Sequence, residues 1–148
     1  MSFTLVLNSS QGTATTAGQT TSIQYNFNWL VLEDNATYEM SFSFASKDAG
    51  NLNSSSQRTV RLNGLGSLNN TYYVTSAGVA TSTELIGAVY PLTVNNTHFL
   101  FAEMATNPPI YLKRRPTGNN FRVEILNTDN TISAGNYEWT LFLFFKKL

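Results

Sequence analysis

The chain contains no cysteine among its 148 residues, and it has a single histidine. The absence of cysteine excludes disulfides, iron–sulfur clusters, thiolate zinc sites and thiol catalysis. The one histidine, His98, leaves too few ligands for a zinc or copper site, and a lone histidine on a strand is usually a hydrogen-bonded surface residue. We therefore expect neither a metal nor any other cofactor.

Charge is also scarce. Charged residues make up 12% of the chain, against about 25% in a typical soluble domain, and the formal net charge is zero. Such a surface has no long-range field to attract DNA or RNA, whose binding depends on neutralising phosphates, so we expect no specific nucleic-acid partner. Low charge leaves little repulsion between copies, which suits a protein that packs against its neighbours.

Long apolar runs and targeting signals are missing as well. No apolar stretch approaches the ~20 residues of a membrane helix, so we expect no transmembrane segment. The opening MSFTLVLNSS has no cationic region and becomes polar too soon for a signal peptide. We expect a chain that works where it is made, or in a particle assembled there.

Alternation of apolar and polar residues dominates the rest of the sequence. In SIQYNFNW, residues 22–29, every second residue is apolar, as in a half-buried strand. Turn signals separate such runs at intervals of about 8–12 residues, which is typical of sandwiches and barrels. The predicted strands are 3–8, 20–31, 36–46, 57–63, 70–75, 83–93, 97–103, 109–115, 120–127 and 137–146.

Eight to ten antiparallel strands in one domain, residues 1–148, predict an all-β, two-sheet single jelly roll with little helix. The carboxyl-terminal strand is expected in the interior of one sheet. An immunoglobulin-like sandwich fits less well, since it needs only about seven strands and ~100 residues.

No residue pattern indicates catalysis. The adjacent carboxylates Glu33 and Asp34 lie in a predicted turn, where solvated turn residues are a better interpretation than a glycosidase pair. The fragment Gly64-Leu65-Gly66 lacks the third glycine and the strand-to-helix context of a phosphate site, so we interpret it as a turn. We expect that the protein is not an enzyme and has no catalytic, cofactor-binding or metal-binding residues.

The last predicted strand, YEWTLFLFF, is apolar on both faces. Its alternate residues suit the core, but Phe142 and Phe144 make the opposite face apolar too. A strand of this kind is covered on both sides, here by the opposite sheet and by either a loop of the same chain or a neighbouring subunit. Phe142 and Phe144 are therefore candidate subunit contacts. Lys146 and Lys147 are expected to protect the strand from edge-on aggregation.

The densest positive charge lies in NPPIYLKRRPTGNNFRVEIL, residues 107–126. Lys113, Arg114 and Arg115 end one predicted strand, a turn follows, and Arg122 lies on the outward face of the next strand. A basic hairpin tip can pair with carboxylates of another subunit, bind phosphate or anionic lipid, or remain a solvated loop. We favour a subunit contact, with the solvated loop as the main alternative.

The same stretch resembles a segment of small viral capsid proteins. Residues 107–123 read N-P-x-I-x-L-x-R-x-P-T-x-N-x-F-x-V. This pattern resembles the segment that joins two late strands in the single jelly-roll capsid proteins of large icosahedral DNA viruses, in particular the phycodnaviruses and their mimivirus-like relatives. YNFNW at 25–29 and YEMSFSFAS at 38–46 also resemble the early strands of these proteins.

The resemblance implies a structural role in the virion. Such proteins form pentameric vertices, called pentons, or act as minor capsid proteins beneath the major capsomers. Many minor capsid proteins have long arms, and because we see none here, the penton role suits this sequence better. The implied partners are copies of the chain, as a homopentamer, and neighbouring capsid proteins. The implied location is the capsid, assembled in the host cell.

An alternative function remains open at this stage. A jelly roll with exposed aromatic side chains can bind carbohydrate, as lectins and fibre-tip domains do. The sign of such a site is two or three exposed aromatic residues that converge beside Asn or Asp in one cluster of loops.

Overall fold

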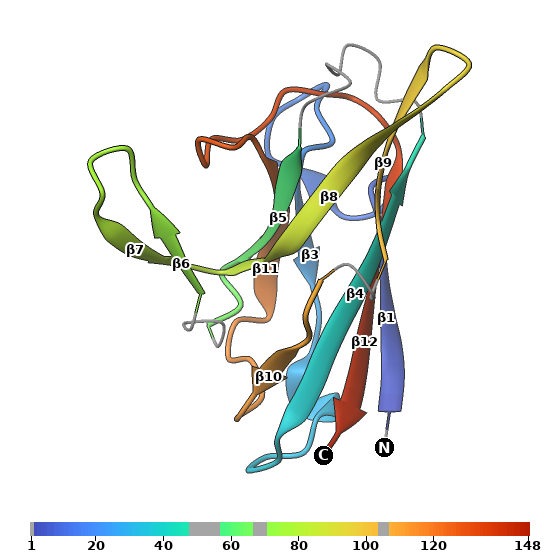
Figure 1. Cartoon of the computed structure of the whole chain (residues 1–148). Helices are drawn as coiled ribbons and strands as arrows, with labels where there is room; N and C mark the ends of the chain where they lie inside the picture. Colours follow the sequence, from blue (N-terminus) through green and yellow to red (C-terminus); the bar gives the residue numbers. More distant parts are fainter. Residues whose placement is uncertain (1, 48–56, 67–70, 104–106) are drawn as a thin grey trace.

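The computed structural model of the chain describes residues 2–47, 57–66, 71–103 and 107–148 (Figure 1). Its strands are β1 (Ser2–Asn8), β2 (Thr13–Ala14), β3 (Ser22–Asn26), β4 (Tyr38–Ser46), β5 (Arg58–Asn63), β6 (Thr71–Val74), β7 (Ala80–Thr83), β8 (Leu85–Val94), β9 (Thr97–Ala102), β10 (Ile110–Leu112), β11 (Asn120–Leu126) and β12 (Trp139–Lys147). A single turn of 3-10 helix, η1 (Trp29–Val31), lies between β3 and β4. The predicted all-β fold is confirmed.

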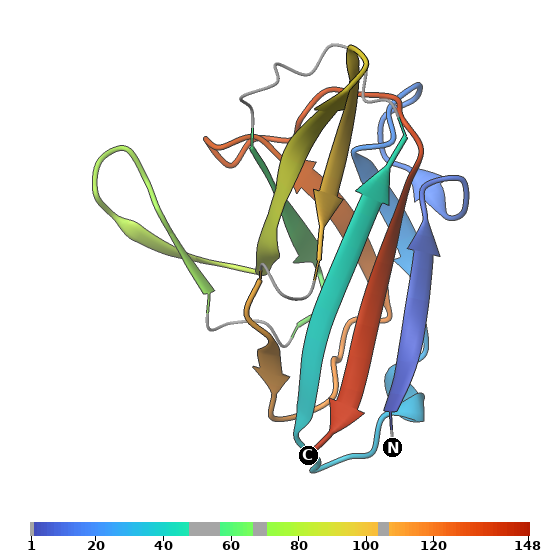
Figure 2. The same cartoon turned by 45° about the vertical axis from the view of Figure 1, so that its right-hand side comes forward.

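Ten of the twelve described strands form the main sheet. The hydrogen-bonded order is β1-β12-β4-β9-β8-β5-β11-β3-β2, and β10 pairs with β4 beside that path. The path curls so that β4, β12 and β1 face β5, β11 and β3 across the core (Figures 1 and 2). We call the layer of β1, β12, β4, β9 and β10 the first sheet, and the layer of β5, β11, β3 and β2 the second. The result is a jelly-roll-like antiparallel sandwich.

β8 joins the two layers because its halves pair with different neighbours. Residues 85–89 pair with β5, and residues 90–94 pair with β9. Gly87 lies in the first half, where a Cβ would overlap Asn107 Oδ1 and lie 2.6 Å from Phe42 Cε1. The two layers meet so closely at this point that only glycine fits without a shift of its neighbours.

The strand predicted at 20–31 is too long. β3 ends at Asn26, and Trp29 lies in η1. The Asn28 side chain accepts a hydrogen bond from the Leu30 N–H at 3.0 Å. An asparagine that bonds the backbone in this way offers an alternative to the sheet ladder, so the apolar alternation continues in sequence after the strand has ended.

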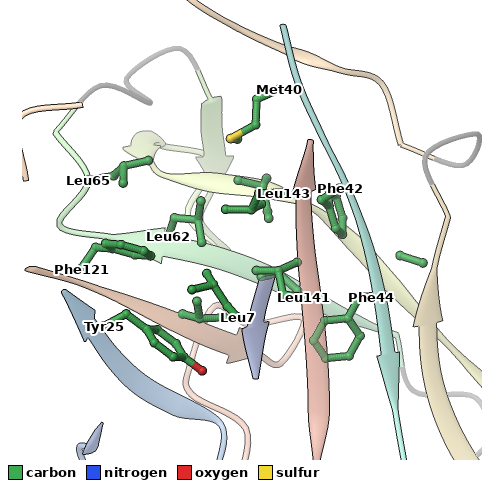
Figure 3. Packing of buried hydrophobic residues seen from close by; sticks show 14 of the residues in the cluster. Leu7, Tyr25, Met40, Phe42, Phe44, Leu62, Leu65, Phe121, Leu141 and Leu143 are labelled. Atoms are coloured by element: carbon green, nitrogen blue, oxygen red, sulfur yellow. The ribbon is translucent and has the colours of Figure 1, made fainter. Parts of the chain in front are cut away.

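The core lies between the two layers (Figure 3). Phe42 and Phe44 of β4 and Leu141 and Leu143 of β12 are buried and point toward the second sheet, as the period of two predicts. β12 lies between β1 and β4, so its predicted interior position is confirmed. Burial of side chains of this size stabilises the fold by roughly 1.5–3 kcal/mol each.

Trp29 connects the two sheets within this core. Its ring centroid lies 5.7 Å from that of Phe121 on β11 and 5.8 Å from that of Phe145 on β12. Its indole Nε1–H donates to the Gly118 carbonyl at 3.0 Å. A buried tryptophan needs such an acceptor, so η1 serves to place this ring rather than to continue β3.

Asn107, the first residue of the resembling segment, acts as a strand partner for β8. Its Nδ2 donates to the Ala88 carbonyl at 3.0 Å, and its Oδ1 accepts from the Ala88 N–H at 2.9 Å. Three residues later β10 begins, and Ile110 and Leu112 pair with Met40 and Tyr38 of β4. The start of the segment is thus fixed to both layers of the sandwich.

Candidate functional site

The six predicted contact residues lie in three separate places. Phe142 and Phe144 lie on the outer face of the first sheet, because the residues between them face the core. Residues 113–115 follow β10 at the end of the sandwich where β12 ends and β4 begins. Arg122 lies on the outer face of the second sheet, since Phe121 and its alternates on β11 are buried in the core. The structure does not unite these residues in one site.

Phe142 and Phe144 form a half-buried aromatic pair. Their ring centroids lie 6.3 Å apart with an interplanar angle of 11°. In register, Phe142 lies between Val6 of β1, which is 52% exposed, and Ser43 of β4. We call Val6, Phe142 and Phe144 the outer patch. No described segment crosses this face of the first sheet (Figure 2).

The surroundings of the outer patch are uncharged at the centre and charged at one margin. Thr4 and Ser41 flank Phe144 in register. A shallow depression beside Phe144 extends to Glu39 and Lys146, which are register partners of opposite charge. An apolar centre with a charged rim is the usual composition of a protein–protein interface.

A second apolar group lies on the same outer face, on β8 and β9. Tyr90 is paired in register with Phe101, and Leu92 with Phe99. Both phenylalanines are half-buried, whereas Leu100 between them is buried in the core. The sequence did not predict this group. In the run HFLFA, residues 98–102, both sets of alternate residues contain large apolar side chains. Alternation alone therefore cannot show which set faces the core.

The exposed tyrosines are dispersed. Tyr72, Tyr90 and Tyr111 lie on β6, β8 and β10, respectively. The carbohydrate-binding alternative requires exposed rings that converge in one cluster of loops, and these three lie on separate strands.

The basic segment is not the tip of a hairpin, and that prediction was wrong. β10 pairs with β4 in the first sheet and β11 pairs with β3 and β5 in the second, so residues 113–119 cross between the layers. The Gly118 N–H donates to the Leu65 carbonyl at 3.0 Å, and the Phe27 N–H donates to the Asn119 carbonyl at 2.9 Å. These contacts between distant segments place the crossing, and a local turn pattern contains no information about them.

The three cations of this segment differ in their surroundings. Arg115 lies 3.7 Å from the Asp34 carboxylate, and its guanidinium donates to the Leu32 carbonyl at 3.4 Å. Lys113 and Arg114 are exposed, and neither forms an ion pair with another described residue. Arg115 is therefore used within its own chain, and Lys113 and Arg114 are the two available for a partner.

Lys146 and Lys147 do not protect an edge, contrary to expectation, because β12 has a strand on each side. The Lys147 ammonium instead pairs with the Glu33 carboxylate, and this bond raises the pKa of Lys147 and lowers that of Glu33. β1 is a free edge of the first sheet, because it pairs with β12 alone among the described strands; β10, which pairs with β4 alone among them, is another.

Several titratable groups of the described residues form structural contacts. Glu124 is only 2% exposed, and its carboxylate lies 3.0 Å from the Arg61 guanidinium, as a buried charge requires. His98 Nδ1 lies 3.0 Å from the Thr93 hydroxyl. Within the described ranges, no group of three or more His, Cys, Asp or Glu residues could hold a metal ion, and no helix is long and apolar enough to span a membrane.

The Gly64-Leu65-Gly66 fragment is a turn that holds an anion from its own chain. The Glu84 carboxylate accepts from the Gly64 N–H at 2.7 Å and from the Gly66 N–H at 2.9 Å. Both glycines have positive φ, which points successive N–H groups toward one acceptor. Because Glu84 fills this position, the turn stabilises the junction between β5 and β8.

Tyr137 provides a test of the core by pH. Burial raises the pKa of its phenol to about 12, and the hydroxyl has no hydrogen-bond partner among the described residues. The folded state therefore keeps a proton that the unfolded state releases from about pH 10 upward, so stability falls as the pH rises toward 12. In Tyr137→Phe we expect a smaller alkaline loss, and an unfolding free energy at pH 7 that is unchanged or up to ~1 kcal/mol higher.

Urea denaturation at pH 7 and at several pH values between 9 and 12 measures both effects. Tyr25→Phe is the control, since the Tyr25 hydroxyl donates to the Asn8 carbonyl at 2.5 Å, and its removal should destabilise the protein at pH 7 by about 1–2 kcal/mol. A comparable loss in Tyr137→Phe at pH 7 would show that the Tyr137 hydroxyl has a partner.

No protein-family model matches this chain, and no curated protein matches its sequence. The structural basis for a functional interpretation is therefore the jelly-roll-like fold and the outer patch, above which no described segment lies.

Proposed function

We propose that this chain is a structural capsid subunit, and that it assembles with its own copies into the pentameric vertex of a large icosahedral DNA virus. The observation that carries the proposal is the outer patch, where aromatic rings lie on the outer face of the sandwich without a described segment above them. Partly exposed apolar side chains grouped on one outer face, with Val6 52% exposed and the two phenylalanines half-buried, are typical of a surface that contacts another molecule. The low charge of the chain suits close packing of identical copies.

The resembling segment supports the proposal through the fold. Asn107 ties the segment to β8, Leu112 is buried where β10 meets β4, and Phe121 and Val123 are buried in the core. The residues that carry the likeness are thus largely those that place β10 and β11 in different sheets. A resemblance at these positions directly supports a shared jelly-roll framework. It supports the capsid role only through that framework.

A ring of identical copies needs two different surfaces on each subunit. Heterologous contacts repeat around an axis, and each patch meets a different patch of the next copy. The outer patch is the first such surface, and exposed Lys113 and Arg114 at the end of the sandwich suit the rim of a contact. A stable interface of standard size buries about 1,200–2,000 Å² in total.

The capsid role is tested on purified particles of the virus that encodes the chain. We expect its peptides in washed, nuclease-treated virions, in a small fixed ratio to the major capsid protein, and antibody label confined to the vertices. Absence of the protein from such particles would contradict the proposal.

A further inference from the structure

β6 and β7 form a two-stranded hairpin apart from the main sheet. We call residues 71–83 the arm. It stands out from the side of the sandwich opposite to β1 in both views (Figures 1 and 2). Its turn is well formed, since the Gly78 N–H donates to the Thr75 carbonyl at 2.8 Å and the Thr75 N–H donates to the Val79 carbonyl at 2.9 Å. Of its two strands, the sequence predicted β6, within residues 70–75, but not β7.

The arm has the properties of a segment that needs a partner. Tyr72, Val74 and Val79 are 63%, 61% and 59% exposed. Its sequence, TYYVTSAGVATST, contains no charged residue. A two-stranded hairpin alone is at best marginally stable in water, because it has no third strand and no covered face. Contact with an edge strand of another copy would supply the third strand.

β1 offers an open edge for such a contact. The Ser9 N–H donates to the Trp139 carbonyl at 2.9 Å, so these two residues form a hydrogen-bonded pair of the antiparallel ladder. Every second residue of β1 before Ser9 then also bonds to β12. Leu5 and Leu7 therefore bond to β12, and the backbone groups of Thr4 and Val6 point away from it, toward the free edge. This edge, Ser2–Asn8, contains no proline, lysine or other charged residue that would discourage pairing.

We propose that the arm of one copy adds to the β1 edge of the next copy and extends its first sheet. Backbone hydrogen bonds from an added strand supply affinity, and alternate side chains supply specificity. Tyr72 and Val74 would then lie beside Val6 and continue the apolar row through Phe142. An arm cannot reach the β1 edge of its own chain, because the two lie on opposite sides of the sandwich (Figure 2).

The contact is heterologous, since each copy provides an arm and receives one. Repeated contacts of this type close into a ring when the rotation between copies permits it. Because neither surface carries charge, the contact should depend little on salt. This inference rests on the proposed self-assembly and names the elements that produce it.

Two complementary variants test the arm-to-edge contact. The edge variant Val6→Pro loses an N–H that makes no bond to β12, so it should keep the fold but block addition of a strand. The arm variant Tyr72→Asp/Val74→Asp places charges on two exposed positions of β6. Val6→Thr is the matched control, because it keeps the N–H and a β-branched side chain.

Native mass spectrometry and light scattering give the result. We expect each variant alone to stay monomeric where the wild type and Val6→Thr assemble. An equimolar mixture of the two should form a heterodimer and stop there, because the edge variant supplies a competent arm and the arm variant a competent edge. Circular dichroism checks that each variant is folded.

The outcomes separate this inference from the proposed function. If both variants assemble like the wild type, or if their mixture stays monomeric while the wild type assembles, the arm-to-edge contact is overturned and the capsid proposal stands. A wild-type protein that does not assemble at all overturns both. Unfolding of Val6→Pro would contradict the assignment of β1 as an open edge, since it would mean that the Val6 N–H forms a hydrogen bond within its own chain.

Discussion

The Phe142→Asp variant is expected to remain folded and monomeric under conditions in which the wild type assembles. Phe142 lies on the outer face of β12, stacks on Phe144 and has no described segment above it, so a carboxylate there stays hydrated in the monomer. In a contact the same carboxylate would be buried without a partner. Loss of a central aromatic contact weakens an interface by about 2–4 kcal/mol, which corresponds to about 30- to 1,000-fold per contact.

Size-exclusion chromatography with light scattering measures assembly, and circular dichroism with urea denaturation measures the fold. Gln24→Asp is the matched control, because Gln24 is exposed on the outer face of the second sheet. It should assemble like the wild type. A Phe142→Asp protein that assembles normally would remove Phe142 from the interface, and one that misfolds would show that its own chain covers this position.

The Gly118→Ala variant is expected to fail to fold. A Cβ at Gly118 would overlap the Gly64 carbonyl oxygen and lie 2.9 Å from the Gly64 carbonyl carbon. Both are backbone atoms, so no side chain can rotate away to make room. Separating them breaks the 3.0 Å bonds from the Gly118 N–H to Leu65 and from the Trp29 indole to Gly118. We expect a loss above ~4 kcal/mol, comparable with the whole stability of a marginal domain.

Soluble yield and urea denaturation check this result. Gly18→Ala is the control, since no atom lies within 4 Å of the added Cβ and only its positive φ opposes the change. Its loss should be near 1 kcal/mol. If Gly118→Ala were as stable as Gly18→Ala, the crossing at residues 113–119 would not be packed against the turn at residues 64–66.

The sheet faces could be predicted where only one phase of a strand is apolar. Phe42 and Phe44 alternate with serines, so the buried side of β4 follows directly from the sequence. Phe99, Leu100 and Phe101 are apolar in both phases, and there the outward position of the two aromatic rings depends on the neighbouring strands. Apolar and polar residues that alternate with a period of two identify a strand. Which face of that strand is buried depends on the segments that cover it.

Long-range pairing was the part that the sequence could not show. The turn chemistry after Arg115 predicts a reversal of the chain, yet β10 and β11 enter different sheets because Asn107 and Gly118 are held by distant segments. In the arm the sequence predicted β6 but not β7, because Ala80–Thr83 of β7 are small or polar and show no apolar alternation. The two-faced apolar character of β12 was evident from Phe142 and Phe144, while the adjacent free edge of β1 was not.

The most direct test of the capsid proposal is the mass of the purified wild-type protein in solution, measured by native mass spectrometry across a range of concentrations. We expect a closed species of five copies of the 16.4 kDa chain. A closed ring gives one discrete mass, because the last contact joins the first and last copies and stops growth. A protein that keeps the mass of a single chain up to its highest soluble concentration would contradict the proposal.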